Sequence, residues 1–322
     1  MHFIVGAFSV SGIAFIFPGQ ASQFVGMAQD LHAQHEGVQN LFAIADGILG
    51  FELSAVCFGG PEEQLAQTVV TQPAVFVHSI AAYELLADRG VRPSILAGHS
   101  LGEYSALVAA GALDFETALE LVRERSRAMQ EAGETRPGAM AAIIGPKDSD
   151  VIALCEQVAD TGVVVAANFN APGQVVVSGE REAIARLGVL AIESGVKRFV
   201  ELPVNGAFHS PLMQPAADRM QDLLRDAHIE TPRVPVITNV SASPVDDPDI
   251  LRLDLIKQIT HSVRWTESMG ALVNAGIERA VEVGPGLVLK GLMRRIAREV
   301  TVLAAGTADD IEHTSAQLKG EN

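Results

Sequence analysis

The sequence has little of several residue types that would place it in a special structural class. Its 322 residues include two cysteines, Cys57 and Cys155, which lie far apart and form no Cys-x-x-Cys pair. This excludes a disulfide framework and a thiolate zinc site, and it favours a reducing compartment such as the cytoplasm. Basic residues are also scarce, because 23 Lys and Arg stand against 39 Asp and Glu, a formal charge of −16. A chain this acidic has no electrostatic footprint for nucleic acid or for an anionic membrane, so we expect neither as a partner.

No lysine or arginine precedes Arg89, although residues 1–17 are largely apolar. A secretory signal needs basic residues before its apolar core. Glycine and serine also interrupt the run before it reaches the ~20 apolar residues of a membrane span. We therefore expect residues 12–17 to form a buried first strand, preceded by an extension to which the sequence assigns no purpose.

What the sequence does have is an apolar fraction of 48%, enough for a sizeable core. Short apolar runs that end in glycine or proline alternate with longer amphipathic stretches. The runs are residues 13–17, 95–97, 234–238 and 279–283, and the helical stretches include 103–110, 117–132, 211–227 and 288–297. This alternation predicts an α/β domain with a largely parallel sheet.

Residues 137–205 follow a different pattern. Strand-like runs at 140–144, 163–167, 174–178 and 197–202 surround helical stretches at 149–159 and 180–190. The order strand, helix, strand, strand, helix, strand is that of a ferredoxin-like unit. We predict a small subdomain at residues 137–205, inserted into a larger subdomain formed by residues 1–136 and 206–322.

The segment Gly98-His99-Ser100-Leu101-Gly102 fits the pattern Gly-x-Ser-x-Gly. It follows an apolar strand and precedes a helix, which is the context of a nucleophile elbow, where a strained turn exposes the serine hydroxyl. A glycine-rich turn with a buried serine is the alternative. The strand and the helix on either side favour the nucleophile.

A serine nucleophile needs a base, and nine histidines are available. His209 comes just before Ser210-Pro211, a good N-cap followed by a good first helical residue. A loop at a helix entrance can hold a catalytic group rigidly, so His209 is the best candidate. His99, beside the serine, is a candidate for the pocket wall. The other seven are interpreted as structural or surface residues.

Arg125 lies in the apolar stripe of the predicted helix 117–132, between Val122 and Met129. A guanidinium turned toward the interior needs an anionic partner, because an isolated buried charge is costly. An internally paired or snorkelling arginine fits this pattern equally well. The functional interpretation is an arginine that binds a substrate carboxylate with two parallel hydrogen bonds.

Together these motifs resemble the malonyl-CoA:acyl-carrier-protein transacylases and the related acyltransferase domains of polyketide synthases. The resemblance covers about residues 13–298 and rests on several motifs in the family's order. They are residues 17–23 (Phe-Pro-Gly-Gln-Ala-Ser-Gln), 98–104 around Ser100, Arg125 with residues 129–130, residues 168–170 (Asn-Phe-Asn), 206–209 ending in His209, Gln258, and 282–286 (Glu-Val-Gly-Pro-Gly). It implies an α/β-hydrolase-like large subdomain with a parallel sheet and an inserted ferredoxin-like small subdomain.

The resemblance also implies a role for each matching residue. Ser100 is the nucleophile, His209 the base, Gln258 the residue whose backbone carbonyl orients His209, and Arg125 the clamp on the malonyl carboxylate. The remaining implied roles are the oxyanion hole (Gln20 and Leu101), substrate binding (His99, Phe208 and Asn168) and docking of the carrier protein (Arg294 and Arg295). Malonyl-CoA and acyl carrier protein are the implied partners of a monomer, with no metal and no cofactor.

Two alternatives belong to other functional classes. An esterase or thioesterase of the α/β-hydrolase type accounts for the elbow and the histidine, but not for Arg125 or the inserted subdomain. A catalytically idle acyl-binding module has no use for an elbow serine. The sequence leaves open whether the carrier belongs to fatty-acid or to polyketide synthesis.

Overall fold

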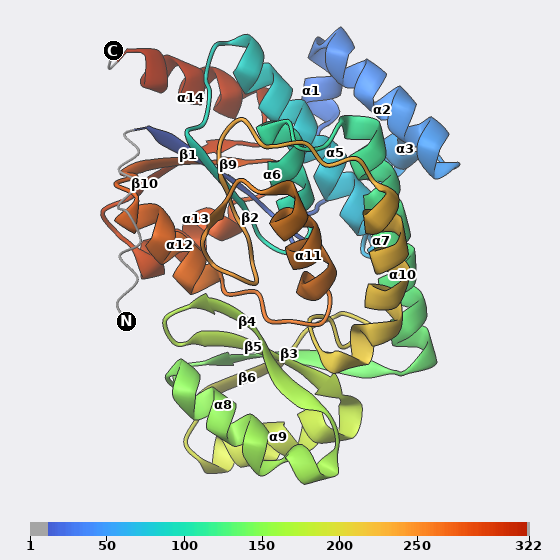
Figure 1. Cartoon of the computed structure of the whole chain (residues 1–322), viewed down its shortest axis with the longest axis vertical. Coiled ribbons are helices and arrows are strands. Elements are labelled where there is room, and N and C mark those ends of the chain that lie inside the picture. Colours follow the sequence, from blue (N-terminus) through green and yellow to red (C-terminus); the bar gives the residue numbers. More distant parts are fainter. Residues whose placement is uncertain (1–11, 321–322) are drawn as a thin grey trace.

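The computed structural model describes residues 12–320, and the extension expected before Gly12 lies outside them. The described chain forms two packed bodies, each built on its own sheet (Figure 1). We call the body with the six-stranded sheet the large subdomain and the body with the four-stranded sheet, at the bottom of Figure 1, the small subdomain.

The sheet of the large subdomain has the strand order β10-β9-β1-β2-β7-β8. Five strands are parallel, and β8 pairs with β7 in the antiparallel direction. The strands are β1 (Ile13–Phe17), β2 (Ile95–Gly98), β7 (Val236–Ile237), β8 (Pro244–Val245), β9 (Arg279–Val283) and β10 (Thr301–Ala305). The run expected at 234–238 is therefore a strand at two residues only, and β8 and β10 were not expected.

The side chains of β1 alternate between two cores. Phe15 and Phe17 belong to the core on one face of the sheet, and Ala14 and Ile16 to the core on the other. All four have an exposed fraction of 0%. A parallel strand covered on both faces is apolar throughout, which explains why β1 shows no polar alternation in the sequence.

Helices cover both faces of this sheet (Figure 1). The core that contains Ala14 and Ile16 is closed by α12 and α13, and the larger core by most of the other helices. The helices are α1 (Gln29–Gln34), α2 (Glu36–Leu49), α3 (Leu53–Gly59), α4 (Glu62–Leu65), α5 (Thr68–Asp88), α6 (Gly102–Ala110), α7 (Phe115–Thr135), α10 (Gln214–Asp226), α11 (Pro248–Gln258), α12 (Trp265–Asn274), α13 (Val288–Ile296) and α14 (Ala308–Lys319).

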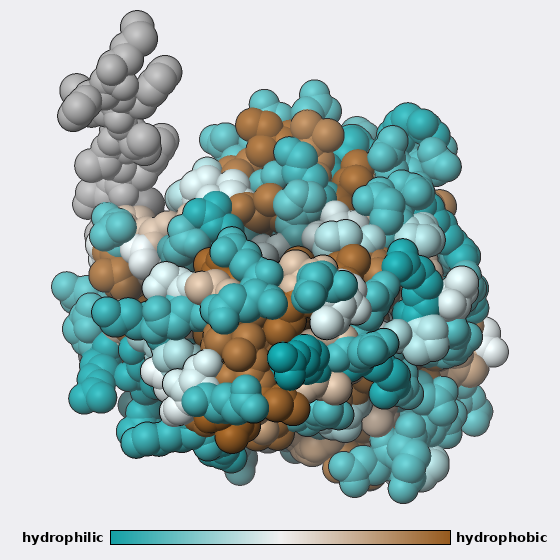
Figure 2. Space-filling view, turned by 90° about the horizontal axis from the view of Figure 1, so that it is seen from below, coloured by the Kyte–Doolittle hydropathy of each residue, from teal (hydrophilic) through white to brown (hydrophobic). Residues whose placement is uncertain are grey.

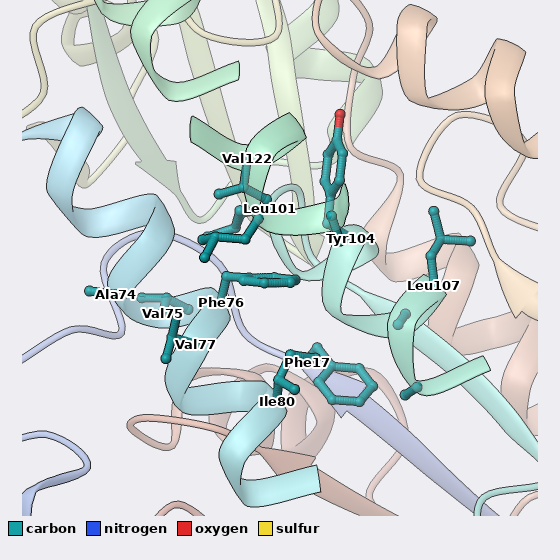
Figure 3. Close-up of a cluster of buried hydrophobic side chains, with 14 of the residues drawn as sticks. Phe17, Ala74, Val75, Phe76, Val77, Ile80, Leu101, Tyr104, Leu107 and Val122 are labelled. Atoms are coloured by element: carbon teal, nitrogen blue, oxygen red, sulfur yellow. The ribbon is translucent and has the colours of Figure 1, made fainter. Parts of the chain in front are cut away.

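Helix α5 is the central helix of the larger core. It is apolar and long enough to cross a membrane, but 83% of its apolar window is buried inside the protein. Figure 3 shows Phe76 of α5 lying below Leu101 and Val122, with Phe17 of β1 further down the same core. A helix that is apolar on all sides is typical of such a buried position, so α5 is a core helix on which the elbow rests.

The small subdomain has the element order expected from the sequence. Its strands form an antiparallel sheet in the order β4-β5-β3-β6, with α8 and α9 packed on one face. This order is that of a ferredoxin-like fold, which confirms the fold class. The elements are β3 (Gly138–Ile144), α8 (Asp148–Gln157), β4 (Val164–Ala171), β5 (Gln174–Glu180), α9 (Arg181–Glu193) and β6 (Arg198–Glu201).

The two faces of this second sheet have different neighbours. Ala141, Ile143 and Val177 pack with α8 and α9, whereas Met140 and Val176 belong to the core of the large subdomain. Figure 2 views the molecule from the side of the small subdomain, where apolar patches lie among polar groups. The large apolar side chains that the small subdomain exposes are Ile152, Val189, Ile192 and Val200.

Backbone hydrogen bonds fix the small subdomain to the large one. Val263 N–H donates to the carbonyl of Ala167 (2.8 Å), and Phe169 N–H donates to the carbonyl of Val263 (2.9 Å). Val263, in the segment before α12, therefore pairs laterally with Asn168 of β4 as an isolated parallel bridge. Main-chain hydrogen bonds thus help to hold β4 against the large subdomain.

The turn from β2 to α6 requires both of its glycines. A Cβ atom at Gly98 would lie 1.9 Å from the carbonyl carbon of Gly102, and one at Gly102 would lie 2.2 Å from the carbonyl oxygen of Phe17. Between them, Ser100 has a φ of 51°. A non-glycine residue in this region is strained and occurs mostly at functional positions. The sequence pattern thus produces the sharp turn that it predicts.

Candidate active site

Ser100 and His209 lie side by side although 109 residues separate them in the chain. Ser100 Oγ and His209 Nε2 are 2.8 Å apart. His209 is 4% exposed and has a φ of 57°, so it too sits in a strained turn. The turn is held by Ser210, whose hydroxyl donates to the carbonyl of Ala207 and accepts from the N–H of Leu212. Ser210 caps a 3-10 turn, Pro211–Met213, which leads into α10.

The second ring nitrogen of His209 faces a backbone carbonyl. Nδ1 lies 2.7 Å from the carbonyl oxygen of Gln258, at the end of α11. A carbonyl only accepts, so Nδ1 carries the proton and Nε2 is free to accept from the Ser100 hydroxyl. Burial, and after it the positive charge of Arg125, lower the pKa of His209 to about 3. The ring is therefore neutral at pH 7.

Arg125 is buried as the apolar stripe predicts, with an exposed fraction of 1%. Its guanidinium donates to Gln72 Oε1 (2.6 Å), Gln258 Oε1 (2.9 Å) and Ser100 Oγ (3.1 Å). It also lies 5.8 Å from the ring centroid of Tyr104. Burial lowers its pKa, which Tyr104 and a nearby carboxylate oppose. These three hydrogen-bond partners are neutral, so the charge is available to an anionic ligand.

Gln72 and Asn239 are site residues that the sequence analysis missed. Asn239 Oδ1 accepts from the N–H of Ser100 (2.7 Å), and its amide donates to the carbonyl of Gly98 (2.6 Å). Asn239 directly follows the predicted strand 234–238, where the carboxyl ends of parallel strands gather functional groups. Gln72 is the one amide side chain in the sequence of α5. The position of Asn239 after a strand and the isolated amide of Gln72 in an apolar stretch were visible in the sequence, but each is a weak indication of a site.

A cavity opens beside Ser100 between the two subdomains. Its lining residues include the sequence candidates Gln20, His99, Ser100, Leu101, Arg125, Asn168, Phe208 and His209. Met140 and Val176 of the small subdomain and Val288, Leu289 and Leu292 of α13 complete its apolar walls. These expected residues therefore converge on one space.

His99 is part of the cavity wall. Its Nε2 lies 2.8 Å from Asn170 Oδ1, and its ring packs against Trp265 with 5.3 Å between centroids. Burial lowers its pKa. Asn170 thus holds a residue next to the nucleophile, although the sequence analysis gave it no separate role.

Arg294 and Arg295 lie outside the cavity, on α13, and are both exposed. They are not equivalent, which the sequence could not reveal. Arg295 donates to Gln174 and to the carbonyl of Pro172, and so ties α13 to the β4–β5 hairpin. The start of α13 is anchored by the buried carboxylate of Glu282, which accepts from the N–H groups of Leu289 and Lys290.

Across residues 12–320, no group of three or more His, Cys, Asp or Glu side chains is placed to hold a metal ion. An α/β fold in which a serine at a nucleophile elbow is hydrogen-bonded to a histidine is typical of enzymes that form an ester on that serine. The sequence model of a protein family described as "Acyl transferase domain" matches residues 14–319 of this chain.

Named relatives narrow this class. The chain is similar to a malonyl CoA-acyl carrier protein transacylase of Bacillus subtilis (strain 168), with 42% identity over 97% of this chain and 99% of the relative. A solved structure of such a transacylase from Coxiella burnetii superposes with a TM-score of 0.93, at 40% identity and with 97% and 99% of the two chains covered. Another solved structure is described as a type II PKS acyl-carrier protein in complex with its malonyl-transacylase. It superposes with a TM-score of 0.92 at 39% identity, with 95% of this chain and 100% of that chain covered. The chain therefore belongs to the acyltransferases, in the family of malonyl CoA-acyl carrier protein transacylases.

His209 should stay uncharged where an ordinary histidine titrates. Because burial lowers its pKa to about 3, its ring nitrogen shifts should be constant from pH 8 down to about pH 5, whereas an unperturbed ring titrates near 6.5. Nitrogen-15 NMR of histidine-labelled protein measures this, with His209→Gln providing the assignment.

The unfolded chain in urea is the control, since its histidines should titrate normally. The unfolded state binds this proton near pH 6.5 and the folded state only near pH 3, so the stability associated with the neutral ring is lost as the pH falls through that range. A His209 resonance that titrates near pH 6.5 in the folded protein would contradict the assignment.

Proposed function

We propose that this chain transfers a malonyl group from malonyl-CoA to the phosphopantetheine thiol of acyl carrier protein, through an ester on Ser100. The names of its relatives support the substrates. The observation that carries the proposal is the position of Arg125, 3.1 Å from Ser100 Oγ. In a malonyl group one methylene separates the carboxylate from the reacting carbonyl, so the carboxylate's partner must lie this close to the nucleophile.

In the first half-reaction Ser100 Oγ attacks the thioester carbonyl while His209 Nε2 accepts the hydroxyl proton. Gln20 and Leu101 line the cavity beside Ser100, and in this proposal their backbone N–H groups stabilise the oxyanion. When the intermediate collapses, the carbon–sulfur bond breaks and His209 returns the proton to the CoA thiolate. The product is the malonyl ester of Ser100.

In the second half-reaction the carrier thiol loses its proton to His209 and attacks the ester carbonyl. The carbon–oxygen bond breaks and His209 returns the proton to Ser100. The carbonyl of Gln258, 2.7 Å from Nδ1, keeps the ring oriented through both halves. All the chemistry uses side chains and backbone groups of this chain, so the proposal includes no cofactor. We also propose that the reaction takes place in the cytoplasm.

Other side chains around the cavity support a preference for malonyl over bulkier acyl groups. Phe208, which is 5% exposed, His99 and Asn168 line the same cavity as Ser100. A phenyl ring at this place crowds an α-methyl group. Excluding one methyl group is worth only about 1–3 kcal/mol, so the preference is one of degree.

Ser100→Ala should abolish acyl-enzyme formation and leave the fold intact, because it removes only the nucleophilic oxygen. Intact-mass measurement after mixing with malonyl-CoA should show a malonyl adduct on the unaltered protein and none on the variant. An adduct on the variant would place the nucleophile elsewhere. Free malonate without any adduct would favour a hydrolase, and neither product would favour a binding module.

Arg125→Ala should reverse the preference between acyl donors. Removing one member of a buried charge pair costs about 2–5 kcal/mol, or roughly 30- to several-thousand-fold in kcat/KM for malonyl-CoA. Acetyl-CoA has no carboxylate, so its transfer should be unchanged or faster. Arg127→Ala, on the exposed side of the same helix, should alter neither. Equal losses on both donors would make Arg125 structural.

Carrier docking should depend on Arg294, because exposed charges steer an acidic partner mainly through the association rate. Arg294→Glu should raise KM for acyl carrier protein several-fold and leave hydrolysis of the acyl-enzyme unchanged. Arg186→Glu, an exposed reversal on α9, is the matched control. An unchanged KM in the Arg294 variant would remove α13 from the docking surface. Arg295 is unsuitable for this test, since its reversal also breaks the tie to the hairpin.

A further inference from the structure

The site contains a buried carboxylate to which the proposed mechanism assigns no role. Glu103, near the start of α6, is 1% exposed. Its Oε2 accepts from the N–H of Asn239 (2.8 Å) and from Nε2 of Gln258 (3.0 Å). Its Oε1 is buried and has no hydrogen-bond partner among the described residues. One oxygen of this carboxylate is therefore fully engaged and the other is not.

The amide of Gln258 joins this carboxylate to Arg125. Its Oε1 accepts from the guanidinium (2.9 Å), and its Nε2 donates to Glu103 and to the carbonyl of Ser100 (3.0 Å). A cation on one side and an anion on the other fix which end of the amide is oxygen and which is nitrogen. The guanidinium and the carboxylate are thus an ion pair with one amide inserted between them.

Both charges are costly in this place unless they compensate each other. Burial is the main cause that raises the pKa of Glu103 to about 7, and the charge of Arg125 acts in the opposite direction. The charge of Glu103 in turn raises the pKa of Arg125. The charge of Asp254, on α11, raises the pKa of Glu103. The phenol of Tyr104, the next residue on α6, has its own pKa raised by the charge of Glu103. Glu103 is the carboxylate whose charge acts on the buried guanidinium.

We propose that Glu103 is the internal counter-charge of Arg125 and, through it, a specificity-determining residue that limits how tightly the site binds an acidic acyl group. The proposal rests on the function proposed above. In the empty site Glu103 compensates the guanidinium. When a malonyl carboxylate arrives, two anions share one cation, and their repulsion weakens donor binding. This keeps the malonyl ester from being held too firmly for transfer to the carrier.

Glu103→Gln separates charge from hydrogen bonding. The amide oxygen can still accept from Asn239 and Gln258, and only the negative charge is lost. KM for malonyl-CoA should fall about 3- to 30-fold relative to KM for acetyl-CoA, which has no carboxylate to repel. Glu84→Gln removes an exposed carboxylate on α5, outside the cavity, and should leave the ratio unchanged. An unchanged ratio in Glu103→Gln, or an equal change on both donors, would overturn the proposal.

The pH dependence provides a readout that a merely structural residue would not move. Since burial raises the pKa of Glu103 to about 7, the ratio of the malonyl-CoA to the acetyl-CoA KM should rise with pH through neutrality as the repelling charge forms. The CoA portion is common to both donors and cancels in the ratio. In Glu103→Gln the ratio should be flat. A wild-type ratio that is flat, or a variant ratio that still rises, would contradict the assignment.

A folding experiment tests the charge compensation without any substrate. Glu103→Gln should lower the urea midpoint in the parent and lower it less in an Arg125→Met background, where there is no cation to compensate. Additive effects in this double-mutant cycle would overturn the counter-charge. If the cycle shows coupling but the protein takes no malonyl group from CoA, the proposed function fails and the counter-charge stands.

Discussion

A guanidinium buried next to Ser100 is the constraint on which the rest of the site depends. Arg125 lies on α7, and its hydrogen-bond partners come from α5, from the elbow and from α11. A cation removed from water is costly unless protein hydrogen bonds replace its hydration, and here both terminal nitrogens of the guanidinium are hydrogen-bonded while Nε has no partner among the described residues. Three separate parts of the chain must therefore meet at α7, and their meeting brings the serine, the histidine and the cation within one cavity.

Gln258 contacts both His209 and the charged pair formed by Arg125 and Glu103. Its backbone carbonyl orients His209, while its amide separates Arg125 from Glu103. A carboxylate in place of the carbonyl would raise the pKa of the histidine and compete for the guanidinium. A neutral acceptor does neither, so the histidine remains an uncharged acceptor and the cation remains available to a ligand. This is a physical reason why the proposed pair of Ser100 and His209 needs no third, acidic residue.

The sequence predicts what local pattern determines. The glycines at 98 and 102, the strand before them and the helix after them define the elbow, and the apolar stripe of α7 places Arg125 inside. It does not predict partners that only the tertiary fold brings together. Gln72 is 53 residues from Arg125, and Asn239 is 139 residues from Ser100. The two-residue strand β8 has too few positions for a period, and the tie of Arg295 to the hairpin depends on how the subdomains pack.

Helix α13 connects the cavity with the proposed docking residue Arg294. Val288, at the start of α13, lines the cavity, and Arg294 is exposed six residues further along the same helix. At 1.5 Å per residue these positions are about 9 Å apart along the axis. The start of α13 is held by Glu282 and its end by the contacts of Arg295 with the hairpin. In the docking proposed above, a carrier at Arg294 therefore contacts the same helix that lines the cavity beside Ser100.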